Sequence, residues 1–106
     1  VRRITVENDD LIDERDYRVV QVLKAMANGV RYELVRLLME SPHSVSELAD
    51  RVDRSVSSVS RQLSTLEAED LVQSKTEGNR NIHRPKRRDI IQKVFELRTL
   101  LKREEN

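Results

Sequence analysis

The chain has 106 residues, of which 37% are apolar and another 37% are charged, and its formal net charge is +1. This length accommodates one domain with a small core, and a domain of this size often completes its core by dimerising. The lack of cysteine excludes disulfides and thiolate metal sites and favours the cytosol, and no apolar run approaches the roughly 20 residues of a membrane span.

Hydrophobic periodicity and capping residues divide the chain into its expected elements. In chain order these are an N-terminal arm over 1–12, in which Ile4 and Val6 alternate as in a short strand, helices over 13–27, 29–40, 45–51 and 55–70, strands over 71–76 and 81–84, and a fifth helix over 86–103. Asp13, Asn28 and Ser55 suit N-cap positions, and Ser44 with Glu47 forms a capping box. Pro85 fits the first position of the fifth helix.

Two short helices followed by a hairpin around Gly78 predict a winged helix-turn-helix, mainly α with a small β-hairpin, about five helices and a two-stranded wing. Residues 13–106 are expected to form one such domain. Its expected core consists of apolar side chains at helical spacing, namely Tyr17, Val20, Leu23, Ala27, Leu34, Leu37, Leu38, Val45, Leu48, Ala49, Val52, Val56, Val59, Leu63 and Leu66.

The side of the fourth helix opposite its apolar stripe carries hydroxyls and one arginine, and almost no acid. These residues are Ser57, Ser58, Arg61, Ser64 and Thr65. Short side chains allow a helix backbone to approach the floor of the DNA major groove. Arg61 suits either a bidentate contact to guanine or a contact to phosphate, and both alternatives stay open. Arg54 and Ser55, at the start of the helix, would favour a phosphate there.

Positive charge gathers in the second half of the chain. From Lys75 to Lys93 there are seven basic residues against two acids, whereas the chain before Tyr17 has six acids against three arginines. The wing residues predicted to contact DNA are Lys75, Arg80 and Arg84. The cluster at 86–88 is weaker support, because basic residues at a helix start oppose the helix dipole, which hints at an electrostatic partner.

These motifs resemble the ArsR family of bacterial and archaeal transcription repressors. Residues 23–31 (LKAMANGVR) are similar to the family's LKALANPxR, residues 57–63 (SSVSRQL) to its STVSRHL, and VSELA at 45–49 and the segment 66–72 leading to Gly78 also match. The resemblance covers most of the chain and implies a DNA-binding winged helix in a prokaryotic cytosol. The MarR-type winged helices share the pattern of the fourth helix and are a neighbouring possibility.

The chain departs from the family at the positions that bind metal. The founding metal sensors have a Cys-x-Cys pair where this chain has Ser44 and Ser46, and the fifth helix lacks the histidines of the zinc-binding branch. Gly29 replaces a usual proline and Gln62 a common histidine. The resemblance therefore does not imply metal sensing, and no metal or other cofactor is expected.

The first and fifth helices are predicted to form a homodimer, because their apolar surface is too wide for one small domain to bury. The residues expected at this interface are Tyr17, Val20, Ile90, Val94, Leu97 and Leu101, the last four forming a coiled-coil-like seam. His43 and His83 lie far apart in sequence and have no metal-ligand spacing. The sequence contains no catalytic motif, because it lacks a nucleophile–base pairing and a glycine-rich phosphate loop.

The sequence therefore predicts a homodimeric, sequence-specific regulator that binds double-stranded DNA, a repressor at a palindromic operator. The alternative is a winged helix that serves as a protein-interaction module within a larger assembly. The hydroxyl-rich face of the fourth helix argues against that alternative, because partner-binding faces are richer in aromatic anchors. Binding of single-stranded nucleic acid is a third possibility, disfavoured by the small number of aromatic side chains.

Overall fold

The computed structural model describes residues 2–5 and 11–104, and within these ranges the chain forms five helices and two small sheets. The elements in chain order are β1 (Arg3–Thr5), β2 (Leu11–Asp13), α1 (Glu14–Met26), α2 (Gly29–Glu40), β3 (His43–Ser44), α3 (Val45–Val52), α4 (Val56–Ala68), β4 (Val72–Glu77), β5 (Arg80–Pro85) and α5 (Arg88–Arg103). The strands β4 and β5 form the antiparallel wing, and β3 pairs with the other edge of β5. The predicted winged helix-turn-helix is confirmed.

The predicted caps set the starts of the first four helices. The side chains of Asp13, Asn28 and Ser55 each accept a hydrogen bond from a backbone N–H in the first turn of their helix. The capping box is complete, because Ser44 accepts from the Glu47 N–H at 3.2 Å while the Glu47 carboxylate accepts from the Ser44 N–H at 2.8 Å. These bonds satisfy donors that have no partner within a helix.

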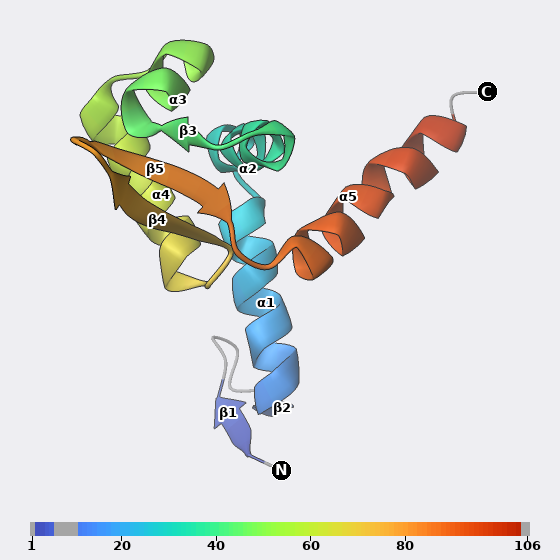
Figure 1. The fold of residues 1–106 in the computed structure, drawn as a ribbon. Coiled ribbons are helices and arrows are strands. Elements are labelled where there is room, and N and C mark those ends of the chain that lie inside the picture. The colour runs from blue at the N-terminus through green and yellow to red at the C-terminus, as the bar shows by residue number, and fades with distance from the viewer. Residues whose placement is uncertain (1, 6–10, 105–106) are drawn as a thin grey trace.

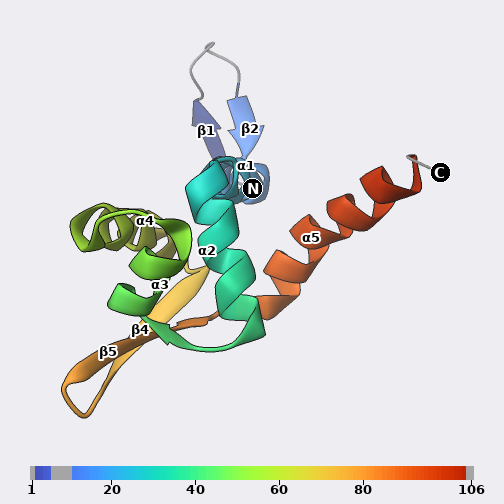
Figure 2. The same cartoon turned by 90° about the horizontal axis from the view of Figure 1, so that it is seen from above.

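The core lies where α2 meets α3, α4 and the base of the wing. Its fully buried side chains include Leu34, Leu37, Leu38, Leu48, Leu63, Leu66, Leu71 and Ile91. Helix α5 contributes only Ile91 as a buried residue within its described length. Beyond that first turn α5 extends away from the body, on the side opposite to α4 and the wing (Figures 1 and 2).

The structure corrects three expectations. Val56, expected in the core, is 47% exposed, because it is the first residue of α4 and lies at an end of the helix where Ser55 and Ser57 are exposed too. Pro85 ends β5 instead of starting a helix, and α5 begins at Arg88. In α1 the buried residues are Val22, Ala25 and Met26, so the inward stripe lies beside the predicted one, and Leu23 is 47% exposed.

The sequence left two strands, β2 and β3, unpredicted. The short strand around Ile4 is present as β1, and it pairs with β2 to make a hairpin at the start of α1 (Figure 1). Val6, the other half of that pattern, lies outside the described residues. The strand β3 is the second omission, since two residues before a capping box carry no periodicity to detect. Among the described helices, none is long and apolar enough to cross a membrane.

Candidate nucleic-acid interface

A sharp turn between α3 and α4 fixes the direction of the predicted recognition helix. Asp53 ends α3 in the left-handed conformation, with φ 55°, and the Arg54 N–H donates to the Ala49 carbonyl at 3.1 Å. Helix α4 then buries Val59 and Leu63 against the core. Since its apolar side is fixed in this way, its opposite side faces solvent.

The structure gathers the predicted polar residues of α4 on that outer side. Ser57, Arg61, Ser64 and Thr65 are exposed, and Ser58 is half-buried. The Ser64 hydroxyl donates to the Ser60 carbonyl at 3.1 Å, and that of Thr65 donates to the Arg61 carbonyl at 3.4 Å. Because these hydroxyls bond to the backbone of their own helix, they project little from it, and their lone pairs face outward.

Arg61 is the cation at the centre of this face. Its side chain is exposed, and its guanidinium forms no hydrogen bond or ion pair with any other residue that the structure describes. Five N–H donors in a rigid fork are therefore available to a ligand. Among the residues that the structure describes, no bond to another side chain has to break before Arg61 binds.

The wing arginines, in contrast, already have acidic partners. Arg80 contacts Glu47 of the capping box at 2.7 Å, and Arg84 contacts Glu77 across the hairpin at 2.5 Å. These pairs are exposed and thus weak. Their carboxylates would compete with phosphate for the two guanidinium groups, while the pair to Glu47 holds the wing tip beside α3. Lys75, on β4, is exposed.

Two of the three basic residues at 86–88 form ion pairs within the chain. Lys86 contacts Asp70 at 2.5 Å, and Arg87 contacts Asp89 at 2.9 Å. The hydrogen bond from Arg87 lowers the pKa of Asp89 to about 2. Asp89 also lies in the first turn of α5, where a negative charge complements the helix dipole. The cluster therefore needs no external partner to account for its position.

Arg31 is a structural residue that the sequence interpretation missed. Its guanidinium donates to the Ala25 carbonyl at 2.7 Å, to the Lys24 carbonyl at 3.3 Å and to the Gln62 side chain at 2.7 Å. One side chain on α2 thus joins the end of α1 to the middle of α4. The available signal was a cation in the first turn of a helix, where the dipole disfavours it unless it binds elsewhere.

His83, on β5 of the wing, contacts α4. Its ring is buried, its Nε2 lies 3.3 Å from a Glu67 carboxylate oxygen, and its Nδ1 has no hydrogen-bond partner. His43 on β3 and Ser74 on β4 flank it as cross-strand neighbours. The two histidines, distant in sequence, therefore lie on adjacent strands. Burial lowers the pKa of His83, and the Glu67 carboxylate opposes that shift.

This histidine predicts a loss of stability in mild acid. Because its pKa in the folded protein lies below the value of about 6.5 in the unfolded chain, the unfolded chain binds the proton more readily. The contribution is complete above about pH 6.5 and falls as the pH drops towards the pKa of the folded state. Thermal unfolding should therefore show a decrease in melting temperature from about pH 8 to about pH 5.5 that is smaller in His83→Gln.

His43→Gln serves as the matched control, because it removes the neighbouring ring and leaves the buried one. It should retain the pH dependence of the native protein. Identical pH profiles for His83→Gln and the native protein would contradict the assignment.

Part of the outer surface of α1 and α5 is apolar. A groove of about 470 Å³ between the two helices is lined by Val19, Val22, Leu23, Ile90, Val94 and Leu97, with Arg18, Arg87 and Lys93 at its edges. The structure thus brings together three of the predicted interface residues, Ile90, Val94 and Leu97. Tyr17 and Val20 are half-buried on α1 outside this lining, and Leu101 lies further along α5 with 60% of its surface exposed.

Across residues 2–5 and 11–104, no group of three or more His, Cys, Asp or Glu side chains is placed to hold a metal ion. Of Ser44 and Ser46, which stand where the metal sensors have cysteines, Ser44 has a structural role. Ser44 caps α3 and is buried, and Ser46 lies exposed in the first turn of that helix.

Comparisons with known proteins place this geometry among transcriptional regulators. The model of a family described as HVO_A0114 matches residues 26–88. The chain is 30% identical over 88 residues to the HTH-type transcriptional regulator KmtR of Mycobacterium tuberculosis, covering 83% of this chain and 68% of that protein. It is 33% identical over 67 residues to the transcriptional activator HlyU of Vibrio cholerae, covering 63% of this chain and 62% of HlyU, less than two thirds of its length.

Solved structures agree with these sequence matches. The homodimeric winged helix-turn-helix DNA-binding domain of Mb0332 from Mycobacterium bovis, described as "a possible ArsR-family transcriptional regulator", superposes with a TM-score of 0.74 at 26% identity. That superposition covers 89% of this chain and 90% of the domain.

Proposed function

Since this chain belongs to the HVO_A0114 family and is an ArsR-type winged helix-turn-helix transcriptional regulator, we propose that it binds double-stranded DNA as a homodimer, with α4 in the major groove. The observation that carries the proposal is the outer face of α4, where Arg61, which has no ion pair with residues 2–5 or 11–104, stands among small hydroxyl residues. Such a face is unsuited to a protein partner, since it offers no aromatic or apolar anchor.

The rest of the interface is proposed to position α4 on the duplex. Arg54 and Ser55 lie at the N-terminus of α4, where free N–H groups and the helix dipole attract a phosphate. The wing lies on the same side of the molecule as α4 (Figures 1 and 2), so Lys75, Arg80 and Arg84 are in position to contact the adjacent backbone or minor groove.

The dimer is proposed to form through α1 and α5. Leu97, Leu100 and Leu101 are each more than half exposed, an arrangement that is unfavourable for a monomer in water. A second copy would bury this surface and place two α4 helices in a symmetric arrangement, which suits a palindromic operator. The homodimeric Mb0332 domain supports this assembly.

We further propose that the dimer acts as a repressor, by occupying its operator and excluding other proteins from it. This action requires only binding to the operator, for which the DNA-binding face and the dimer surface are sufficient. The proposed place of action is the prokaryotic cytosol, where the chromosome is accessible.

Titration of the protein against labelled duplex DNA at several salt concentrations tests the proposal. Each phosphate contact releases counterions, so the logarithm of the association constant should fall with that of salt, with a slope steeper than about −4 for a dimer. Single-stranded DNA of the same sequence is the control and should bind more weakly. A lack of duplex binding at low salt would contradict the proposal and favour the protein-interaction alternative.

A further inference from the structure

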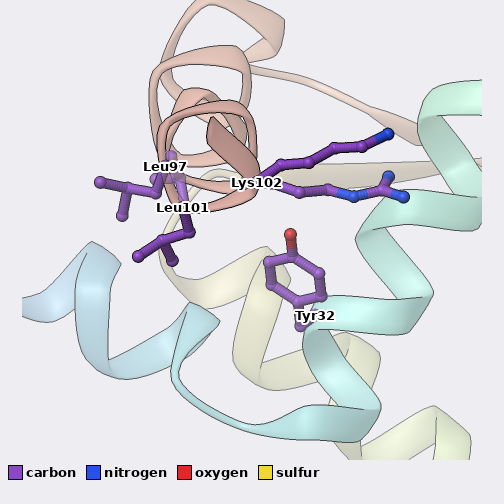
Figure 3. Close-up of a pocket in the computed structure, with 6 residues that line it drawn as sticks. Tyr32, Leu97, Leu101 and Lys102 are labelled. Carbon is purple, nitrogen blue, oxygen red and sulfur yellow. The ribbon is translucent and has the colours of Figure 1, made fainter. Parts of the chain in front are cut away.

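A second cavity opens on the other side of α5, between this helix and α2. It has a volume of about 630 Å³ and is lined by Tyr32, Val94, Leu97, Arg98, Leu101 and Lys102. Tyr32 directs its hydroxyl from α2 towards α5, and the Lys102 side chain extends from α5 towards α2 (Figure 3). The volume lies within the range of about 300–1,000 Å³ that is typical of small-molecule sites.

The lining combines positive charge with an apolar wall. Arg98 and Lys102 are one helical turn apart, so both cations project from the same side of α5. Within the described ranges, no acidic residue lines the cavity and the Arg98 guanidinium has no hydrogen bond or ion pair. Val94, Leu97 and Leu101 supply the apolar surface. This chemistry matches a molecule with an anionic head and an apolar body.

The helix dipole does not account for this charge. Cations are favourable in the last turn of a helix, which explains Lys102 and Arg103. Arg98 lies before that turn and would be equally well hydrated on any exposed side. The Tyr32 ring packs against that of Phe95, with 5.0 Å between the ring centroids, and this contact restricts the Tyr32 side chain.

We infer that this cavity binds an amphipathic organic carboxylate, and that the bound molecule changes the affinity of the protein for DNA. The carboxylate accepts hydrogen bonds from Arg98, Lys102 and the Tyr32 hydroxyl, while the apolar body lies against Leu97 and Leu101. Charge-assisted bonds of this kind are about twice as strong as neutral ones, so the carboxylate supplies the specificity.

Two features connect the cavity to the proposed function, and the inferred effect of the ligand on DNA binding rests on that function. Val94 and Leu97 line both this cavity and the groove between α1 and α5, so a ligand here contacts the side chains that would receive the partner. Tyr32 directly follows Arg31, whose guanidinium holds Gln62 of α4. A ligand that shifts α2 or α5 therefore acts on both the dimer and α4, and such coupling is reciprocal.

Binding is tested without DNA, by following backbone amide NMR signals during titration with 4-phenylbutanoate. The uncharged 4-phenylbutan-1-ol, which has the same apolar body, is titrated in parallel. The carboxylate should shift the signals of Tyr32, Arg98 and Lys102 and bind at least about tenfold more tightly than the alcohol. Equal affinities for the two probes, or no shifts at these residues at millimolar concentrations, would overturn the proposed site.

Variants test which side chains bind the carboxylate. Arg98→Gln should reduce carboxylate affinity to that of the alcohol, and Tyr32→Phe, which keeps the ring against Phe95, should reduce it by a smaller factor. Arg103→Gln removes a cation of α5 outside the cavity and is the matched control. An equal loss in Arg98→Gln and Arg103→Gln would attribute the binding to general charge and overturn the site, and the amide spectrum of each variant verifies its fold.

The inferred effect of the ligand on DNA affinity, the regulatory half of the inference, is tested by repeating the duplex titration with saturating 4-phenylbutanoate. Native protein should change its DNA affinity severalfold, and Arg98→Gln should not respond. Carboxylate binding with no change in DNA affinity would overturn the regulatory half alone. Failure to bind duplex DNA under any condition would overturn the proposed function, while the NMR titration would still decide the site.

Discussion

Arg61→Ala is expected to weaken operator binding by about thirtyfold or more. Each well-placed contact of this kind contributes about 1–3 kcal/mol, and a homodimer loses two of them. Since the Arg61 guanidinium has no partner within the described chain, its removal leaves no unpaired acid behind and the fold should be unaffected. Fluorescence anisotropy with operator duplex measures the loss, and the melting temperature verifies the fold.

The same experiment separates the two contacts that the sequence left open for Arg61. Arg61→Lys keeps the charge but loses the bidentate fork. If Arg61 binds guanine, the lysine variant loses affinity and discriminates poorly at one base pair of each half-site. If it binds phosphate, the variant retains most of its affinity and the salt slope of Arg61→Ala falls by about one unit per contact. Arg103→Ala is the control, and an equal loss there would contradict both roles.

Leu97→Glu is expected to convert a dimer into monomers. Leu97 is 53% exposed in the single chain, so glutamate there remains hydrated in the monomer. In the proposed seam it would place a carboxylate in an apolar contact on each protomer. An uncompensated buried charge costs about 3–5 kcal/mol, which weakens association at least a hundredfold. Sedimentation velocity should therefore show a dimer for the native chain and a monomer for the variant.

Thr99→Glu is the matched control, because it adds the same charge to an exposed position on a different side of α5. It should remain dimeric. A monomeric native protein, or a Leu97→Glu variant that stays dimeric, would contradict the proposed seam. Since a monomer contacts only one half of a palindrome, Leu97→Glu should also lose most of its operator affinity while its melting profile stays cooperative.

Much of the fold could be predicted because local signals are strong in this chain. Asp13, Asn28, Ser44 and Ser55 each start a helix as expected, since capping depends on neighbouring backbone groups alone. Pro85 misled the prediction, because proline, which suits the start of a helix, is also tolerated at the last residue of β5, where the pairing with β3 has already stopped at His83.

The exposed side chains of the candidate site were predictable, but their pairings were not. The outer side of α4 follows from helical periodicity, so the exposure of Ser57 and Arg61 could be predicted. The contacts of Arg80 with Glu47 and of His83 with Glu67 join segments far apart in the chain, and no local pattern encodes them. Val56 shows the opposite error, in which a local pattern predicts too much. Its apolar side chain satisfies the helical periodicity, although the fold leaves it exposed.

The guanidinium of Arg31 has a consequence for the distance between operator half-sites. It connects α1, which belongs to the proposed dimer, to Gln62 on α4, so it sets where each recognition helix stands relative to the twofold axis. The number of base pairs between half-sites would then depend on a side chain that touches neither DNA nor the second protomer. Evolution could retune that spacing at position 31 or 62 while leaving every base-contacting residue unchanged.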